Sequence, residues 1–247
     1  DLQITGAVYN SSGNSVSFLS TYHQGMGFFE LLPETTSYKV IVEHEGKQYD
    51  FNFSDILPAG YVMRINDTNE ESYQIEISKS SVLPRDTIAV SVSCRGTVYA
   101  VEAMRLADAP YVFRLPKSRL PAGCIQFTLY DKKGNILAER LSFNTRPLTY
   151  YRLSAQTEKQ TYVPLEKVNM FLSLNDSIGN PVESSFSLSV RDAGTEIYTS
   201  YQDNILTDLL LSSDIKGYVA NPMQYFEKDD RATRMKLDLL MMVQGWC

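Results

Sequence analysis

The 247-residue sequence contains few of the residues from which catalytic and metal sites are usually built. It has two histidines, three cysteines and one tryptophan, which leaves little material for a metal cage. Its 23 Lys and Arg residues are outnumbered by 29 Asp and Glu residues, and no Lys/Arg cluster occurs. This balance argues against nucleic-acid binding, because phosphate contacts need a basic surface. No apolar run approaches the roughly 20 residues that span a bilayer.

The cysteines do not form a disulfide framework, because small disulfide-stapled domains carry far more of them for their length. Cys94 ends the alternating run 88–92, so we expect it on the buried face of a strand. Cys124 precedes the run 125–129 and should point to the opposite face. Two structural thiols are the simpler interpretation, and a Cys94–Cys124 disulfide is the alternative.

The residues that are abundant indicate a globular, β-rich protein. Hydrophobic residues make up 43% of the chain, which includes 16 Tyr and 11 Phe, and this rules out a disordered polymer. Period-two alternation predicts strands almost everywhere before residue 200, as in an antiparallel sandwich with one packed and one wetter face per sheet. The alternating residues are Tyr38/Val40/Val42, Tyr73/Ile75/Ile77, Ile88/Val90/Val92, Ile125/Phe127/Leu129, Val168/Met170/Leu172/Leu174 and Phe186/Leu188/Val190.

Three short loops share the pattern Asx, two residues, Gly, Asn. They lie at 10–14, 131–135 and 176–180, and each is predicted to be a hairpin turn that the Asx side chain caps while the Gly adopts a positive φ. Asp131 and Asp176 could instead ligate Ca²⁺. The loops lack the dense oxygen spacing of a calcium site, so the turn interpretation is preferred.

A repeated motif indicates modules in series. Leu-Pro-Ala-Gly occurs at 57–60 and again at 120–123, each time before a strand, which favours serial sandwiches. The expected modules are 1–67, 68–146 and 147–247. The first is too short for a sandwich of about 100 residues, so we expect it to be truncated at its N-terminus. The chain also starts at Asp1 without a leader, as after signal removal or in an excised fragment.

The segment 203–247 is predicted to be helical. Asp203-Asn204 can cap a first helix, Asn221-Pro222 can start a second, and Asp229-Asp230 precede a third that ends at Gly245. Its apolar stretch 239–243 must be packed, and we expect it to lie on the third module or on sequence beyond Cys247. A Met-rich helical stripe of this kind is more often core than a binding groove.

No enzymatic constellation is apparent. His44 continues the predicted buried face of a strand, so we expect it to be a partly buried structural residue. His23 precedes a Gly-rich turn and is expected to be exposed. Glu43 and Glu45 could form a carboxylate pair for glycoside hydrolysis, but flanking a hairpin turn they are more typical of a solvated edge. Gly-x-Ser-x-Gly, a phosphate loop and His-Glu-x-x-His are absent from the sequence. We therefore predict no catalytic, cofactor-binding or metal-ligating residue, and no cofactor.

Several motifs resemble a known family. The stretch 157–168, with its Tyr162-Val-Pro164, and the hairpin 176–182 resemble the MG2-type macroglobulin domain, and 6–33 resembles another macroglobulin-type module that is entered in mid-domain. The segment 209–246 is similar to large bacterial cell-envelope proteins in which α2-macroglobulin-like domains precede a TonB-dependent receptor plug-like domain. The Cys-Gly-Glu-Gln thioester motif of full macroglobulins is absent, so covalent protease trapping is not implied.

The resemblance implies a mostly β protein of tandem immunoglobulin-like or fibronectin-like sandwiches with a short helical C-terminal segment. It also implies a periplasmic or outer-membrane-associated, non-catalytic spacer or interaction scaffold of a TonB-linked uptake protein. Its partners would be other envelope proteins or further domains of the same chain. The alternative is a glycan- or ligand-binding module of a nutrient-uptake system that uses exposed aromatic residues. The candidates for that platform are Tyr22, Tyr150, Tyr151, Tyr198 and Tyr201.

Overall fold

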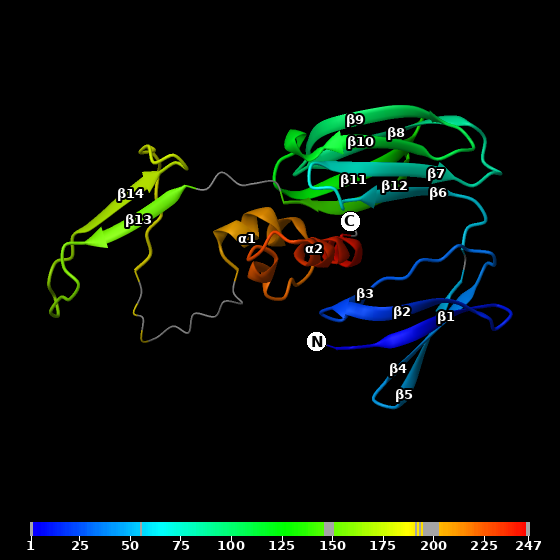
Figure 1. Ribbon diagram of the computed structural model, residues 1–247, viewed down its shortest axis with the longest axis horizontal. Helices are drawn as coiled ribbons and strands as arrows, with labels where there is room; N and C mark the ends of the chain where they lie inside the picture. The colour runs from blue at the N-terminus through cyan, green and yellow to red at the C-terminus, as the bar shows by residue number, and fades with distance from the viewer. Residues whose placement is uncertain are drawn as a thin grey trace. The chain divides into compact units, whose positions relative to one another are not determined.

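A computed structural model describes residues 2–54, 56–145, 151–190, 192, 194 and 203–245 (Figure 1). Antiparallel sheets dominate it, together with two short helices, α1 (Ile205–Leu210) and α2 (Arg231–Gln244). The predicted fold class, mostly β with a helical C-terminal segment, is confirmed. The chain divides into two compact units, one formed by residues 1–146 together with 200–247 and the other by residues 147–199.

The first unit begins with a five-stranded antiparallel sheet. Its order is β3 (Met26–Gly27), β2 (Ser15–His23), β1 (Thr5–Asn10), β4 (Tyr38–His44) and β5 (Lys47–Phe53). The expected alternation on β4 is confirmed, since Tyr38, Val40 and Val42 are buried with Val8 of β1. In contrast, β5 is exposed along its whole length. Its aromatic residues pair directly with the buried positions of β4, so they share the core face, yet Phe51 is 54% exposed.

The second part of this unit is a two-sheet sandwich, which we call the second sandwich because it follows the N-terminal sheet. One sheet has the order β10 (Tyr111–Pro116), β7 (Ser72–Lys79), β6 (Tyr61–Asn66). The other has the order β12 (Ile136–Asn144), β11 (Gly123–Asp131), β8 (Asp86–Cys94), β9 (Thr97–Leu106), and the 3-10 turn η1 (Lys117–Arg119) follows β10. Because β6 pairs with β7, this sandwich begins before the expected boundary at residue 68.

The alternating strands of both sheets fill one core. Tyr73 of β7 packs edge-on against Phe127 of β11, with ring centroids 5.3 Å apart. All three predicted alternating sets in this region are buried: Tyr73/Ile75/Ile77, Ile88/Val90/Val92 and Ile125/Phe127/Leu129. Burial of such side chains contributes about 1.5–3 kcal/mol each, so this core is the main source of stability in the sandwich.

The two cysteines of the sandwich lie on opposite faces of their sheet, as predicted. Cys94 belongs to the core between the sheets, whereas Cys124 faces outward into a second cluster. Both are buried free thiols, which confirms the interpretation as structural residues and excludes the alternative disulfide.

The three predicted Asx turns are also confirmed. In each one the Asx side chain accepts hydrogen bonds from the backbone N–H groups two and four residues later, as at Asp131, where both distances are 2.8 Å. Asn10 and Asp176 make the same pair of bonds. The glycine in each turn has a positive φ, between 80° and 96°, which favours glycine over residues with a Cβ.

The second unit contains a two-stranded sheet of β13 (Arg152–Thr157) and β14 (Met170–Asn175). The strand expected over 186–190 is wrong: no strand occurs between 183 and 190 in the described residues, and Phe186, Leu188 and Val190 are exposed. The alternating residues of β14 are largely exposed as well. Alternation specifies which residues share a face, but a face becomes a core only when a second sheet covers it.

The C-terminal tail is helical as predicted. Asn204 caps α1 through a capping box with Thr207, and Asp230 caps α2 by accepting from the Thr233 N–H at 2.8 Å. The short turns η2 (Ser212–Asp214) and η3 (Pro222–Tyr225) lie between them. Asn221 precedes Pro222 as expected but adopts a left-handed conformation without a side-chain cap. No described helix is long and apolar enough to cross a membrane.

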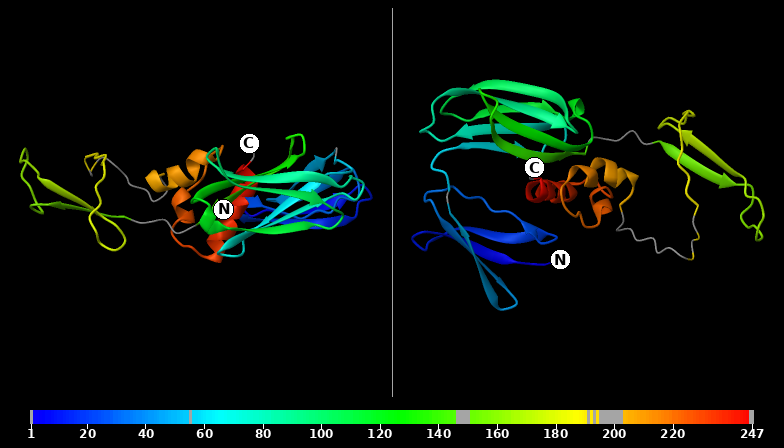
Figure 2. Two further views of the ribbon diagram at one scale, coloured as in Figure 1. Left: turned by 90° about the horizontal axis from the view of Figure 1, so that it is seen from above. Right: turned by 180° about the vertical axis from the view of Figure 1, so that it is seen from behind.

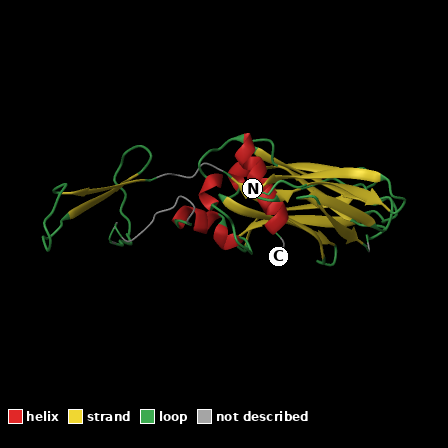
Figure 3. Cartoon of the chain, turned by 90° about the horizontal axis from the view of Figure 1, so that it is seen from below, coloured by secondary structure: helices red, strands yellow, loops and turns green. Residues whose placement is uncertain are grey.

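The expected packing partner of the tail is wrong. Its apolar residues pack on the outer face of the second sandwich rather than on the sheet of residues 147–199. Leu237, Leu240 and Met241 of α2 share a buried cluster with Leu141 and Phe143 of β12. Figure 2 shows α2 between β12 and the N-terminal sheet, and Figure 3 shows the helices beside the strands of the first unit. The reason is that Leu141 and Phe143 give β12 an apolar outer face.

Candidate binding site

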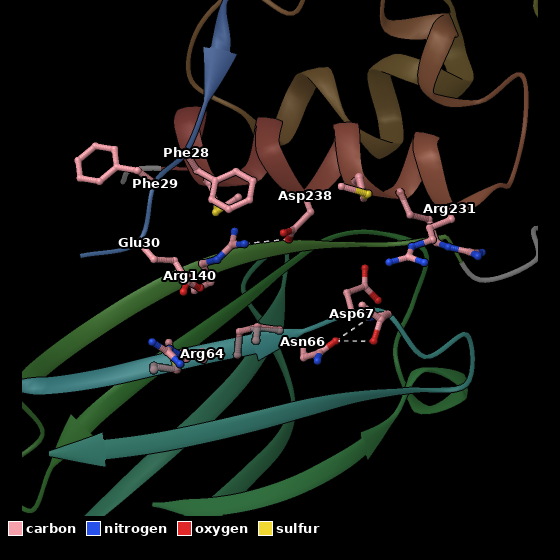
Figure 4. A pocket seen from close by; sticks show the side chains of 15 residues that line it. Phe28, Phe29, Glu30, Arg64, Asn66, Asp67, Arg140, Arg231 and Asp238 are labelled. Atoms are coloured by element: carbon pink, nitrogen blue, oxygen red, sulfur yellow. Dashed lines mark hydrogen bonds and ion pairs between the residues drawn. The ribbon is translucent and has the colours of Figure 1, made fainter. Parts of the chain in front are cut away.

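A cleft of about 570 Å³ lies in the first unit where α2 passes the edges of the second sandwich (Figure 4). Its walls come from β6, β12, α2 and the segment 28–30 that follows β3. We call it the α2 cleft. Its lining residues are Phe28, Phe29, Glu30, Met63, Arg64, Ile65, Asn66, Asp67, Thr68, Arg140, Arg231, Arg234, Met235, Asp238 and Met242.

Helical spacing explains why α2 serves both the core and the cleft. Residues 231, 234, 235, 238 and 242 line the cleft and follow an i, i+3, i+4, i+7, i+11 pattern, so they form one stripe. The buried residues Leu237, Leu240 and Met241 face β12 from the neighbouring stripe. One helix therefore buries an apolar face and presents a mixed apolar and charged face.

The apolar wall is made of flexible and aromatic side chains. Met235 and Met242 contribute from α2, Met63 and Ile65 from β6, and Phe28 from the segment after β3. Methionine is unbranched and polarizable, so such a wall adapts to ligands of different shape.

Asp238 forms the centre of one charged pair in the cleft. Its Oδ1 is 2.8 Å from the Arg140 Nη2, and the Arg140 Nη1 donates to the Leu141 carbonyl at 2.6 Å (Figure 4). Burial raises the pKa of Asp238, and the neighbouring Arg140 opposes that shift. The pair is therefore neutralised within the protein, and neither partner is available as an isolated charge.

Asp67 forms a second charged pair on the side of the sandwich. Its carboxylate pairs with Lys117, which is only 5% exposed. The Lys117 Nζ also donates to the Asn69 carbonyl at 2.8 Å and lies 5.0 Å from the centroid of the Tyr73 ring. Burial raises the pKa of Asp67, while Lys117 lowers it. This network anchors the start of β7 to η1.

Three arginines remain at the edge of the cleft. Arg234 is held by Glu70 and Asp229, each at 2.9 Å. Arg64 and Arg231 are exposed and make neither an ion pair nor a hydrogen bond within the described ranges. Glu30, also exposed, lines the cleft; Figure 4 shows it with Phe28 at the end opposite Arg231.

The histidines considered as candidate site residues in the sequence lie outside the α2 cleft. The prediction that His23 is exposed is wrong: it is 6% exposed, and its Nε2 lies 3.0 Å from the Tyr225 Oη. The tail covers this turn, which sequence alone does not reveal. Burial lowers the pKa of His23, and nearby Lys236 lowers it further. His44 is partly buried at the end of β4, as expected, with its Nε2 3.9 Å from Glu45.

The acidic residues considered as candidate site residues also lie outside the cleft. Glu43 and Glu45 are exposed beside the β4–β5 turn, and Asp131 and Asp176 cap their turns. No group of three or more His, Cys, Asp or Glu residues in the described part of the chain is placed to hold a metal ion. The absence of catalytic, cofactor-binding and metal-ligating residues stays a prediction. Of the five tyrosines, Tyr22 and Tyr151 are about half exposed, and the other three, Tyr150, Tyr198 and Tyr201, lie outside the described residues.

Sequence reasoning missed the α2 cleft. The only available signal was the stripe Arg231, Arg234, Asp238 on a helix that otherwise reads as core. The contribution of β6 and β12 depends on how the edges of two sheets meet the helix, which no local pattern encodes.

Comparison with known proteins places the chain in no family. No protein-family model and no curated protein matches it. One similar solved structure is a tetra-tandem repeat in the extending region of a large adhesion protein, with 15% identity and a TM-score of 0.32 over 73% of this chain and 54% of that one. Another is the BSP domain of a biofilm associated protein, with 18% identity and a TM-score of 0.27 over 60% of this chain and 26% of that one.

The chain thus spans about half and about a quarter of the lengths of these two structures. Both TM-scores are low, so the class of the protein rests on its own sheets. Those sheets define an antiparallel β-sandwich protein with a helical tail docked on the outer face of one sandwich.

Proposed function

We propose that this chain is a non-catalytic scaffold of the bacterial cell envelope that spaces or presents protein partners. The observation that supports this most is the way the tail joins two β modules. Tyr225 of the tail meets His23 of the N-terminal sheet, while α2 packs on β12 of the second sandwich. The joined modules form one compact unit, which supports a spacer role.

The envelope location and the link to uptake rest on sequence motifs. The stretches 157–182 and 209–246 resemble macroglobulin-like domains of envelope proteins that continue into a TonB-dependent receptor plug-like domain. We propose on this basis that the chain lies in the periplasm or at the outer membrane and belongs to a TonB-linked uptake protein. Its partners are then other envelope proteins or further domains of its own chain.

The experiment combines localisation with variants in the organism that encodes the chain. Fractionation followed by antibody detection should recover the protein with the envelope. A Leu237→Ala/Leu240→Ala variant, which frees the tail, should reproduce the phenotype of a gene deletion, whereas His44→Ala should not. Recovery in the cytosol, or a deletion phenotype from stably folded His44→Ala, would contradict the proposal.

A second candidate function, ligand binding, is supported by the α2 cleft more than by an aromatic platform. The cleft combines an apolar wall with charged groups, and its volume is within the range of about 300–1,000 Å³ that is usual for small-molecule sites. The tyrosine platform lacks such support, because Tyr22 and Tyr151 belong to different units.

A further inference from the structure

We propose that the α2 cleft binds a small amphipathic anion, meaning an apolar or aromatic body that carries one carboxylate or sulfonate group. This inference does not depend on the scaffold role. The anionic group would meet Arg231, and the body would lie along the methionine wall toward Phe28.

The choice of an anion follows from which charges in the cleft are already paired. Asp238 is paired with Arg140, and Asp67 is paired with Lys117. Arg231 and Arg64 are left without a partner in the described part of the chain, and of the two only Arg231 belongs to α2. A guanidinium presents a planar fork of donors that matches a carboxylate or sulfonate, so it is the natural contact for a ligand anion.

The position of Arg231 strengthens this choice. It is the first residue of the 14-residue helix α2, where the helix dipole favours negative charge. Two aspartates near this end are already engaged: Asp230 caps the helix and Asp229 pairs with Arg234. Arg234 lies one turn further along the same stripe.

The opposite end of the cleft selects the orientation of the ligand. Glu30 lies there beside Phe28 and has no ion-pair partner among the described residues. The exposed Arg64 also lines the cleft, so the Glu30 carboxylate offsets its positive charge, whereas no unpaired carboxylate lies beside Arg231 among the described lining residues. The apolar end of the ligand is therefore directed to Phe28, and its charged end to Arg231.

The probe for this site is anilinonaphthalene sulfonate, an aromatic sulfonate whose fluorescence rises in apolar surroundings. Titration of the full chain should show one saturable site. Decanoate should displace the probe, and decylamine at the same concentration should not. Arg231→Gln should weaken probe binding by about tenfold, because one charge-assisted contact is lost. Met235→Glu, at a position that is 43% exposed, should abolish it.

Two matched variants separate this site from other surfaces. Arg119→Gln removes an exposed arginine outside the cleft, and Phe51→Ser alters the open face beside β5. Both should bind the probe within about twofold of the wild type, and circular dichroism should show that all variants are folded. Equal binding by Arg231→Gln and the wild type, displacement by decylamine as strong as by decanoate, or loss of binding in Phe51→Ser would each overturn the proposal.

Discussion

Replacing Leu237 by Ala should strongly destabilise the first unit. Leu237 of α2 is 1% exposed and packs in the cluster that α2 shares with β12. The change removes three carbon atoms, whose burial contributes about 0.8 kcal/mol each, or about 2.4 kcal/mol together. The cavity left behind adds to this loss, because such sites relax only in part. We therefore expect a decrease of about 3–4 kcal/mol in the free energy of unfolding.

Urea unfolding followed by far-UV circular dichroism measures this change. Val243→Ala is the matched control, since it lies on the same helix but is 43% exposed, and it should cost less than about 1 kcal/mol. If Leu237→Ala costs no more than the control, the docking of α2 on β12 is refuted. Because Ala has a higher helix propensity than Leu or Val, a loss of stability in either variant reflects lost packing rather than helix propensity.

Four further outcomes are expected. Lys117→Met should lower the free energy of unfolding in urea by about 3–5 kcal/mol, because it leaves a buried carboxylate unpaired. The double variant Lys117→Met/Asp67→Asn should recover part of this loss, and no recovery would argue against the pair. Asp131→Ala should cost about 1 kcal/mol in the same assay, because it removes the acceptor of a turn, and an unchanged midpoint would count against the turn. Burial raises the pKa of Cys124 to about 12, so mass spectrometry should find it modified by a thiol reagent only after unfolding; modification in the native protein would contradict its burial. The pKa of His23 in the folded protein lies below 6.5, so the unfolded chain binds more protons and stability should fall as the pH drops below 6.5. Thermal unfolding of His23→Gln should show a smaller fall in stability over this pH range. If the stability of the variant and of the wild type falls equally with pH, the lowered pKa of His23 is refuted.

The sequence predicts the second sandwich well because its signals are local. Alternation at Tyr73/Ile75/Ile77 and the capping pattern at Asp131 act within a few residues, and the structure places these side chains as expected. The same signal fails at 186–190, where alternation is present but the described residues form no strand. A strand needs a neighbour and a covered face, and neither is specified by its own pattern.

The docking of the tail and the candidate site both depend on contacts that are remote in sequence. His23 and Tyr225 are about 200 residues apart and still share a hydrogen bond, so the burial of His23 could not be inferred from its Gly-rich surroundings. Likewise, Arg231 is recognisable as a cleft residue only once β6 and α2 are placed together. The sequence could predict the stripe of cleft residues on α2. It could not predict that this stripe faces β6 and β12.

Native-state amide hydrogen exchange of α2 in the full chain tests the docked tail most directly. If α2 is part of the first unit, its buried turns should be as well protected as the neighbouring strand β12, because both open only with the shared core. Exchange of α2 within seconds, while β11 and β12 remain protected, would contradict the docking and with it the scaffold that we propose.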